Sequence, residues 1–165
     1  MLRIKSLLVA VLMLASTQAL ADLRIGVVDL RQALFSSDDA RAFSETLQKD
    51  FSADEAKVRQ VQEEARKLRD RLDKDGALMN ENERNQLASE FQGKVQEFNS
   101  LKQRLDASVS KRKQEFLEQA RPQVDAAVKE LLEEHELDLI LPSEAVIYVR
   151  PELNLTDELL EKLNQ

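Results

Sequence analysis

The feature that most constrains this chain is a long charged stretch, residues 38–121, in which apolar residues recur every three or four positions and no proline occurs. The members of this pattern that we call the arm seam are Leu47, Phe51, Val58, Val61, Phe91, Phe98 and Leu105. Such spacing places a narrow apolar stripe along one side of a helix. A break that contains Gly76, at about residues 73–80, divides the stripe into two halves. The sequence therefore predicts two helices that fold back on each other as an antiparallel coiled-coil hairpin.

The apolar residues also predict a register for this hairpin. One alignment of the two halves repeatedly sets apolar residues against each other, pairing Val61 with Val95, Val58 with Phe98, and Phe51 with Leu105. The same alignment sets Asp54 opposite Lys102, which predicts an ion pair that would help to fix the register. The first helix would be roughly 50 Å long at 1.5 Å per residue. A two-helix unit of that length cannot form a globular core, so we expect an arm that projects into solvent.

The first 21 residues have the pattern of a secretory signal peptide. Arg3 and Lys5 precede an apolar run at residues 7–15, and the small residues Ala19 and Ala21 follow it. This order predicts cleavage after Ala21 and export of the remaining chain. A membrane anchor is the alternative, but the apolar run is shorter than the roughly 20 residues that cross a bilayer.

Residues 22–37 and 122–165 differ from the arm and are predicted to form a small β-rich body. Alternating or continuous apolar residues predict strands at 22–29, 137–141 and 145–149, the last one buried on both faces. Three short strands are marginal by themselves and leave open edges, so we expect copies of the chain to associate through their bodies. The residues expected at that contact are Ile25, Val27, Leu139, Leu141, Val146 and Tyr148.

Local signals predict how the remaining helices begin and bend. A short helix is expected at residues 30–35, and the serines and aspartate at 36–38 can cap the first arm helix. Pro122 is expected to kink or restart the second arm helix, because proline lacks a backbone donor. Thr156 is expected to cap a last helix whose leucines face inward. The predicted fold class is α+β and mostly helical, with a long hairpin arm on a small β body.

The residues that usually carry catalysis are scarce. The chain has no cysteine, and its one histidine, His135, is interpreted as a helix-end residue. Gly93-Lys94 lacks the other residues of a phosphate-binding loop. We therefore expect neither an enzyme nor a bound cofactor or metal. The formal net charge of −7 disfavours nucleic acid as a partner, because that binding depends on clustered cations.

Three parts of the chain have a specific sequence: Ile25-Gly26-Val27-Val28-Asp29 with Leu34-Phe35, the apolar segments at 137–140 and 145–148, and Leu155-Thr156-Asp157. These are the most specific parts of a resemblance, over essentially the whole of residues 22–165, to the Skp/OmpH family of periplasmic chaperones from Gram-negative bacteria. It implies a homotrimer whose bodies complete a small β-barrel and whose three hairpins surround a cavity. It also implies that the protein holds unfolded outer-membrane proteins in the periplasm without ATP. A lipopolysaccharide or other anionic membrane contact on the arm would fall at Lys111, Arg112 and Lys113.

Two functions follow from an arm of this kind. As a holding chaperone, the arm would offer many weak contacts to an unfolded chain. Apolar residues outside the seam, namely Leu78, Met79, Leu117 and Val128, are expected to stay accessible for that purpose. The alternative is a structural or adaptor coiled-coil protein of the cell envelope, which would usually have a longer uninterrupted seam.

Overall fold

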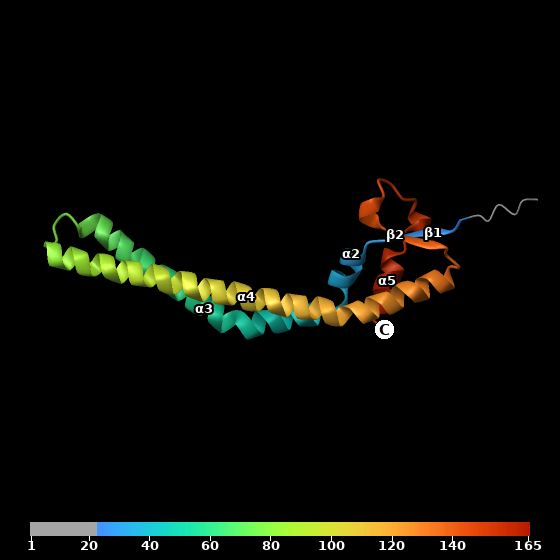
Figure 1. Cartoon of the computed structure of the whole chain (residues 1–165), viewed down its shortest axis with the longest axis horizontal. Coiled ribbons are helices and arrows are strands. Elements are labelled where there is room, and N and C mark those ends of the chain that lie inside the picture. The colour runs from blue at the N-terminus through green and yellow to red at the C-terminus, as the bar shows by residue number, and fades with distance from the viewer. Residues whose placement is uncertain (1–22) are drawn as a thin grey trace, which may run out of the picture.

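Two long helices project as an arm from a small body (Figure 1). The structure is a computed structural model that describes residues 23–165, so the predicted signal peptide at 1–21 lies outside the described residues. The element order is β1 (Ile25–Val28), α2 (Leu30–Ser36), α3 (Asp38–Asp75), α4 (Glu81–Glu134), β2 (Leu139–Pro142), the single-turn helices η1 (Ser143–Ala145) and η2 (Pro151–Leu153), and α5 (Thr156–Leu163). The predicted fold class, mostly helical with a small sheet, is confirmed.

Both arm helices begin with side-chain caps that the local sequence supplies. The Ser37 hydroxyl accepts a hydrogen bond from the backbone N–H of Ala40 at 3.2 Å, as the serine-aspartate signal predicted. Asn80 and Glu83 form a reciprocal capping box at the start of α4. Between the helices, a Cβ at Gly76 would lie 2.3 Å from the carbonyl oxygen of Leu72, so only glycine fits this turn.

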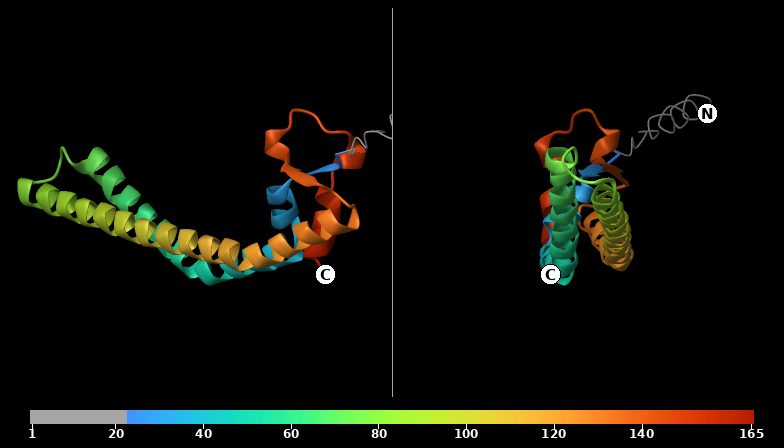
Figure 2. Two further views of the ribbon diagram at one scale, coloured as in Figure 1. Left: turned by 45° about the vertical axis from the view of Figure 1, so that its right-hand side comes forward. Right: turned by 90° about the vertical axis from the view of Figure 1, so that its left-hand side faces the viewer.

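The helix α4 carries the chain from the arm tip into the body without interruption. It continues through Pro122 and does not restart there, and Figure 2 shows it bending as it passes from the arm into the body. A kink is expected because proline cannot donate a backbone hydrogen bond and crowds the preceding turn. The last turns of α4 then place Ala127 and Leu131 in the body, where both side chains are buried.

The body packs one apolar cluster beneath a two-stranded sheet. The buried cluster consists of Val28, Ala33, Ala127, Leu131, Leu155, Leu159 and Leu163. The strands β1 and β2 pair in parallel, with Ile25 opposite Leu139 and Val28 opposite Pro142. The whole arm lies between them in the sequence, as a parallel pair requires a long connection. The inward leucines predicted for α5 are confirmed by the burial of Leu159 and Leu163.

Thr156 has a different role from the predicted one. It is the first residue of α5, not its N-cap, and Leu155 occupies the cap position without a side-chain cap. The Thr156 hydroxyl instead accepts a hydrogen bond from the backbone N–H of Asp29 at 2.9 Å and donates to the Asn154 side chain. Without this bond, the part-buried N–H at the junction of β1 and α2 would lose its hydrogen-bond acceptor. Thr156 thus ties the two ends of the chain together.

The prediction of a strand at residues 145–149 is wrong for the single chain. This segment has no strand, and the side chains of Ile147 and Tyr148 are 107% and 79% exposed. A strand needs a neighbouring strand to pair with. One edge of β1 is occupied by β2, and Val27 on β1 also forms a bridge to Asn154. The apolar segment therefore finds no free partner strand beside β1.

Candidate functional site

The arm seam lies along the contact between α3 and α4, but most of it is only half-buried. Val61 is fully buried at 0% exposure, whereas the other six predicted seam residues, Leu47, Phe51, Val58, Phe91, Phe98 and Leu105, are half-buried. Two helices cannot enclose every side of a stripe that runs along their contact line. The arm therefore presents partly accessible apolar surface along most of its length.

The predicted register is wrong by two to three residues. It would place Glu64 opposite Gln92, but the Glu64 carboxylate pairs with Lys94 at 2.8 Å. Lys102 pairs with Asp106 on its own helix at 2.7 Å, not with Asp54. Apolar residues recur at similar intervals on both helices, so several offsets match apolar with apolar equally well. Specific polar and aromatic contacts select among these offsets.

An aromatic stack holds the register at the base of the arm. The rings of Phe43 and Phe116 lie with their centroids 4.4 Å apart and their planes at 15°. Offset stacking of this kind adds about 0.5–1.5 kcal/mol beyond the area that the rings bury. The predicted alignment would instead set Phe43 opposite Lys113, three residues before Phe116.

A polar cluster holds the register in the middle of the arm. The Lys94 ammonium lies 2.8 Å from Glu64 on α3 and 2.9 Å from Glu97 on its own helix. The hydrogen bond from Lys94 lowers the pKa of Glu64, and the Gln60 side chain adds to this effect. The hydrogen bonds to Glu64 and then Glu97 raise the pKa of Lys94 to about 12. Both groups are thus ionised and paired across the hairpin at neutral pH.

Shallow grooves lie between the two helices where their side chains leave the contact line incompletely filled. One groove of about 210 Å³ lies beside Val58, Leu101 and Leu105. A larger one of about 540 Å³, with largely apolar walls, lies beside Leu68 and Gly93. The sequence offered no signal for either groove, because their existence depends on how far apart the helices lie.

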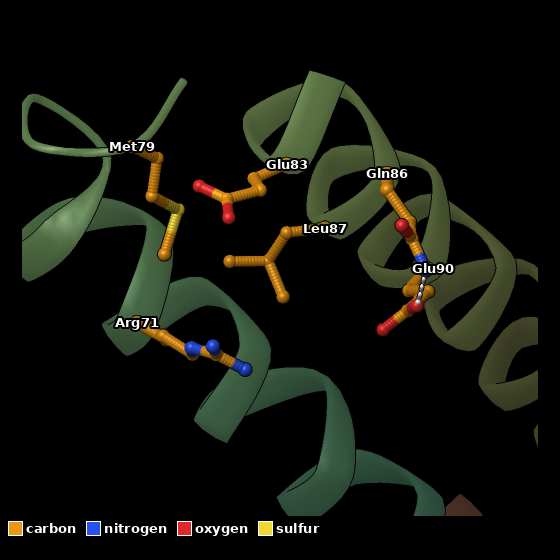
Figure 3. Close-up of a pocket in the computed structure, with 6 residues that line it drawn as sticks. All are labelled: Arg71, Met79, Glu83, Gln86, Leu87 and Glu90. Atoms are coloured by element: carbon orange, nitrogen blue, oxygen red, sulfur yellow. Dashed lines mark hydrogen bonds between the residues drawn. The ribbon is translucent and has the colours of Figure 1, made fainter. Parts of the chain in front are cut away.

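Another pocket, of about 250 Å³, lies near the arm tip (Figure 3). Figure 3 shows Met79 of the connecting loop, Leu87 of α4 and Arg71 of α3 converging on it, with a hydrogen bond between Gln86 and Glu90 at its rim. The polar groups there come from long side chains on exposed helical surface, which is a poor arrangement for holding a reactive group in place. We interpret this pocket as a surface hollow.

The predicted off-seam residues have mixed outcomes. Leu78 at the arm tip is 89% exposed, and Leu117 on α4 is also exposed, so both are accessible as predicted. Met79 is half-buried in the tip pocket. Val128 is half-buried and packs against the buried cluster of the body. It lies beyond the bend of α4, where the helix already belongs to the core.

The candidate anion contact consists of exposed cations that are partly neutralised. Lys111 lies 3.8 Å from Glu115, and Arg112 lies 3.6 Å from Glu115 and 3.7 Å from Asp50 across the hairpin. Lys113 is exposed on the same turn. Pairs this exposed contribute about 0–1 kcal/mol each, so their neighbours do not prevent a phosphate from competing for these cations.

The predicted body-contact residues divide into two groups. Val27 is buried within the chain itself, and Ile25, Leu141 and Val146 are half-buried. Leu139 and Tyr148 are exposed on the body surface. His135 ends α4 as predicted, and its Nε2 lies 2.6 Å from a carboxylate oxygen of Glu158 on α5.

The described part of the chain offers apolar and charged surfaces suited to binding. Across residues 23–165, no group of three or more histidine, cysteine, aspartate or glutamate side chains is placed to hold a metal ion. None of the helices in that range is long and apolar enough to cross a membrane. Chemically, the arm can make apolar contacts between charged side chains, and the body can bury apolar residues against another surface.

This chain is similar in sequence to curated proteins and similar in fold to a solved structure. It is 26% identical over 158 residues to the "Skp-like protein" of Pseudomonas aeruginosa, covering 96% of this chain and 94% of that relative. It is 23% identical over 140 residues to the "Chaperone protein Skp" of Vibrio cholerae, covering 85% and 83% of the two chains. A crystal structure of an OmpH-like protein from Caulobacter crescentus, described as an outer membrane chaperone, has the same fold, with a TM-score of 0.62 at 17% identity over 86% and 84% of the two chains.

The sequence model of the family described as "Outer membrane protein (OmpH-like)" matches residues 24–163, which include every helix and strand of the structure. The resemblance to Skp/OmpH proteins is thereby confirmed. The chain belongs to the OmpH-like family.

Proposed function

We propose that this protein is an ATP-independent holding chaperone of the periplasm that binds unfolded outer-membrane proteins between the helical arms of a homotrimer. The observation that carries the proposal is the half-buried seam on an arm that extends away from the body (Figure 1). Six of the seven seam residues keep part of their apolar surface accessible. The curated relatives named Skp and the family membership support the same reading.

The arm suits reversible holding because its contacts are numerous and individually weak. Linked weak contacts give high avidity while each contact can be released separately. Apart from Val61, Ala65 and Leu87, few arm residues near the tip are buried, so the hairpin can separate locally at low cost. Clients of different sizes could then fit between the arms without an energy source.

The body supports the proposed trimer. A two-stranded sheet is marginal by itself, and the exposed Leu139, Ile147 and Tyr148 surround it with apolar surface. Association of bodies would pair the open edge of β2 and bury these side chains. Export to the periplasm follows from the predicted signal peptide at residues 1–21.

Lipopolysaccharide or an anionic membrane surface is the weaker part of the proposal. Its candidate contacts are Lys111, Arg112 and Lys113, of which the first two are paired with acidic side chains. The overall acidic balance of the chain opposes long-range attraction to anions. We therefore propose only a local, salt-sensitive contact there.

Light scattering tests the holding function directly. A urea-unfolded outer-membrane barrel protein is diluted into nucleotide-free buffer with and without the purified chain. Suppressed aggregation at about one trimer per client supports the proposal, and avidity predicts that suppression falls when the arms are truncated. Unchanged aggregation in the presence of a well-folded oligomer refutes holding and favours the structural adaptor.

A further inference from the structure

We propose that the groove beside Gly93 is a binding subsite for apolar side chains of an unfolded polypeptide. The groove lies between α3 and α4 and has a volume of about 540 Å³. Its lining residues are Glu64, Lys67, Leu68, Glu90, Gly93 and Lys94. This inference rests on the proposed holding function and assigns part of it to one place on the arm.

The walls of the groove are apolar although four of its six residues are charged. Three of these four charged ends are already paired: the Lys94 ammonium binds Glu64 and Glu97, and the Glu90 carboxylate accepts a hydrogen bond from Gln86 at 3.2 Å. With these three ends paired, the aliphatic stems of the lining side chains offer apolar surface to the groove beside Leu68. An apolar group entering the groove would therefore displace water without breaking these pairs.

Packing within one chain does not explain why position 93 is a glycine. A Cβ built on it meets no atom within 4 Å, and its backbone is ordinary right-handed helix. Glycine inside a helix is less favourable than alanine because it loses more conformational freedom on folding. Glycine does, however, let another molecule approach the helix backbone closely. Gly93 thus keeps the groove open.

The charges around the groove select the kind of occupant. Two carboxylates, Glu64 and Glu90, and two ammonium groups, Lys67 and Lys94, balance each other, so the rim has no net preference for an ion. The groove is also open to solvent along one side, which suits a chain that enters and leaves better than an enclosed small molecule. A neutral, extended segment with apolar side chains meets both conditions.

Selective glycine labelling can locate the binding directly. The chain has only three glycines, so protein labelled with ¹⁵N-glycine has three backbone signals, and Gly93→Ala identifies the one from the groove. The probe is a net-neutral synthetic peptide that alternates aromatic and polar residues, and the matched peptide has serine in place of each aromatic residue. We expect the Gly93 signal to shift saturably with the aromatic peptide only, while the Gly26 and Gly76 signals stay in place.

Side chains that fill the groove provide the second readout. Gly93→Leu should weaken binding of the aromatic peptide about tenfold, as expected when one apolar side chain is excluded from its site. It should also melt at or above the wild-type temperature, since leucine favours helix. Ser100→Leu is the matched control, because it adds the same side chain to an exposed position two turns further along α4. We expect this control to bind like wild type.

Each outcome bears on the inference separately from the holding function. A Gly93 signal that does not move, or equal affinity in Gly93→Leu and wild type, overturns the subsite. If wild type holds the unfolded barrel protein and Gly93→Leu holds it equally well, holding stands and the subsite fails. If the Gly93 signal moves with the peptide but wild type does not suppress aggregation, the subsite stands and the holding function fails.

Discussion

Replacing Val61 by alanine should destabilise the arm by about 2 kcal/mol. Val61 is the one arm-seam residue at 0% exposure, so the substitution removes two fully buried carbon groups. Each buried group of this size contributes about 0.8 kcal/mol, and the cavity left behind adds to the loss. Val58, one turn earlier, is half-buried. The same substitution there should cost roughly half the transfer term, under about 1 kcal/mol.

Native-state hydrogen exchange of the arm amides measures this difference. The protection of residues around position 61 should fall by about 2 kcal/mol in Val61→Ala and by clearly less in Val58→Ala, while α5 in the body keeps its protection. The two variants change the same side chain in the same helix, so helix propensity does not separate them. Equal losses would refute the reasoning. They would mean that Val58 is buried as deeply as Val61 in the working protein, for example against another arm.

Three further outcomes are expected. Because Lys94 lowers the pKa of Glu64, their contact stabilises the arm at pH values above 4.5, the ordinary pKa of glutamate, and this stabilisation is lost as the pH falls below that value. Glu64→Gln should therefore flatten the fall in the exchange protection of the arm amides between about pH 5 and pH 3. Thr156→Val should cost about 1–3 kcal/mol in urea unfolding because the part-buried N–H of Asp29 loses its acceptor. The control Thr46→Val, on the exposed face of α3, should cost little. Tyr148→Asp should lower the mass of the oligomer in sedimentation, and Leu78→Asp at the arm tip should leave that mass unchanged.

Local patterns in the sequence predicted the elements of the arm well. The three-to-four residue spacing of apolar positions determines that α3 and α4 are helices, and the Ser37 cap and the break near Gly76 determine where α3 begins and ends. These signals lie within a few residues of the features that they predict. The bend of α4 on its way into the body agrees with the kink expected from Pro122, which is also a local signal.

The register and the Gly93 groove depended on contacts between distant residues. The apolar pattern tolerates a shift by a few residues, and the choice is made by Glu64 with Lys94 and by Phe43 against Phe116. Neither contact stands out among the many charged and apolar side chains of the arm. The groove is harder still to predict, because a glycine in a helical pattern says nothing about the distance to the neighbouring helix.

The segment 145–149 carries a different lesson, because its composition and its conformation disagree. Five consecutive apolar residues favour a strand buried on both faces, yet Ile147 and Tyr148 lie exposed and unpaired with any strand in the described chain. Exposing two large apolar side chains side by side is unfavourable for a monomer, and one body has no free strand beside β1 to accept them. A second copy would supply both an edge and an apolar face. The pattern that misleads for the single chain is therefore the pattern expected of a chain whose sheet is completed by other copies. Tyr148→Asp tests this interpretation at one of the two exposed large apolar residues of the segment.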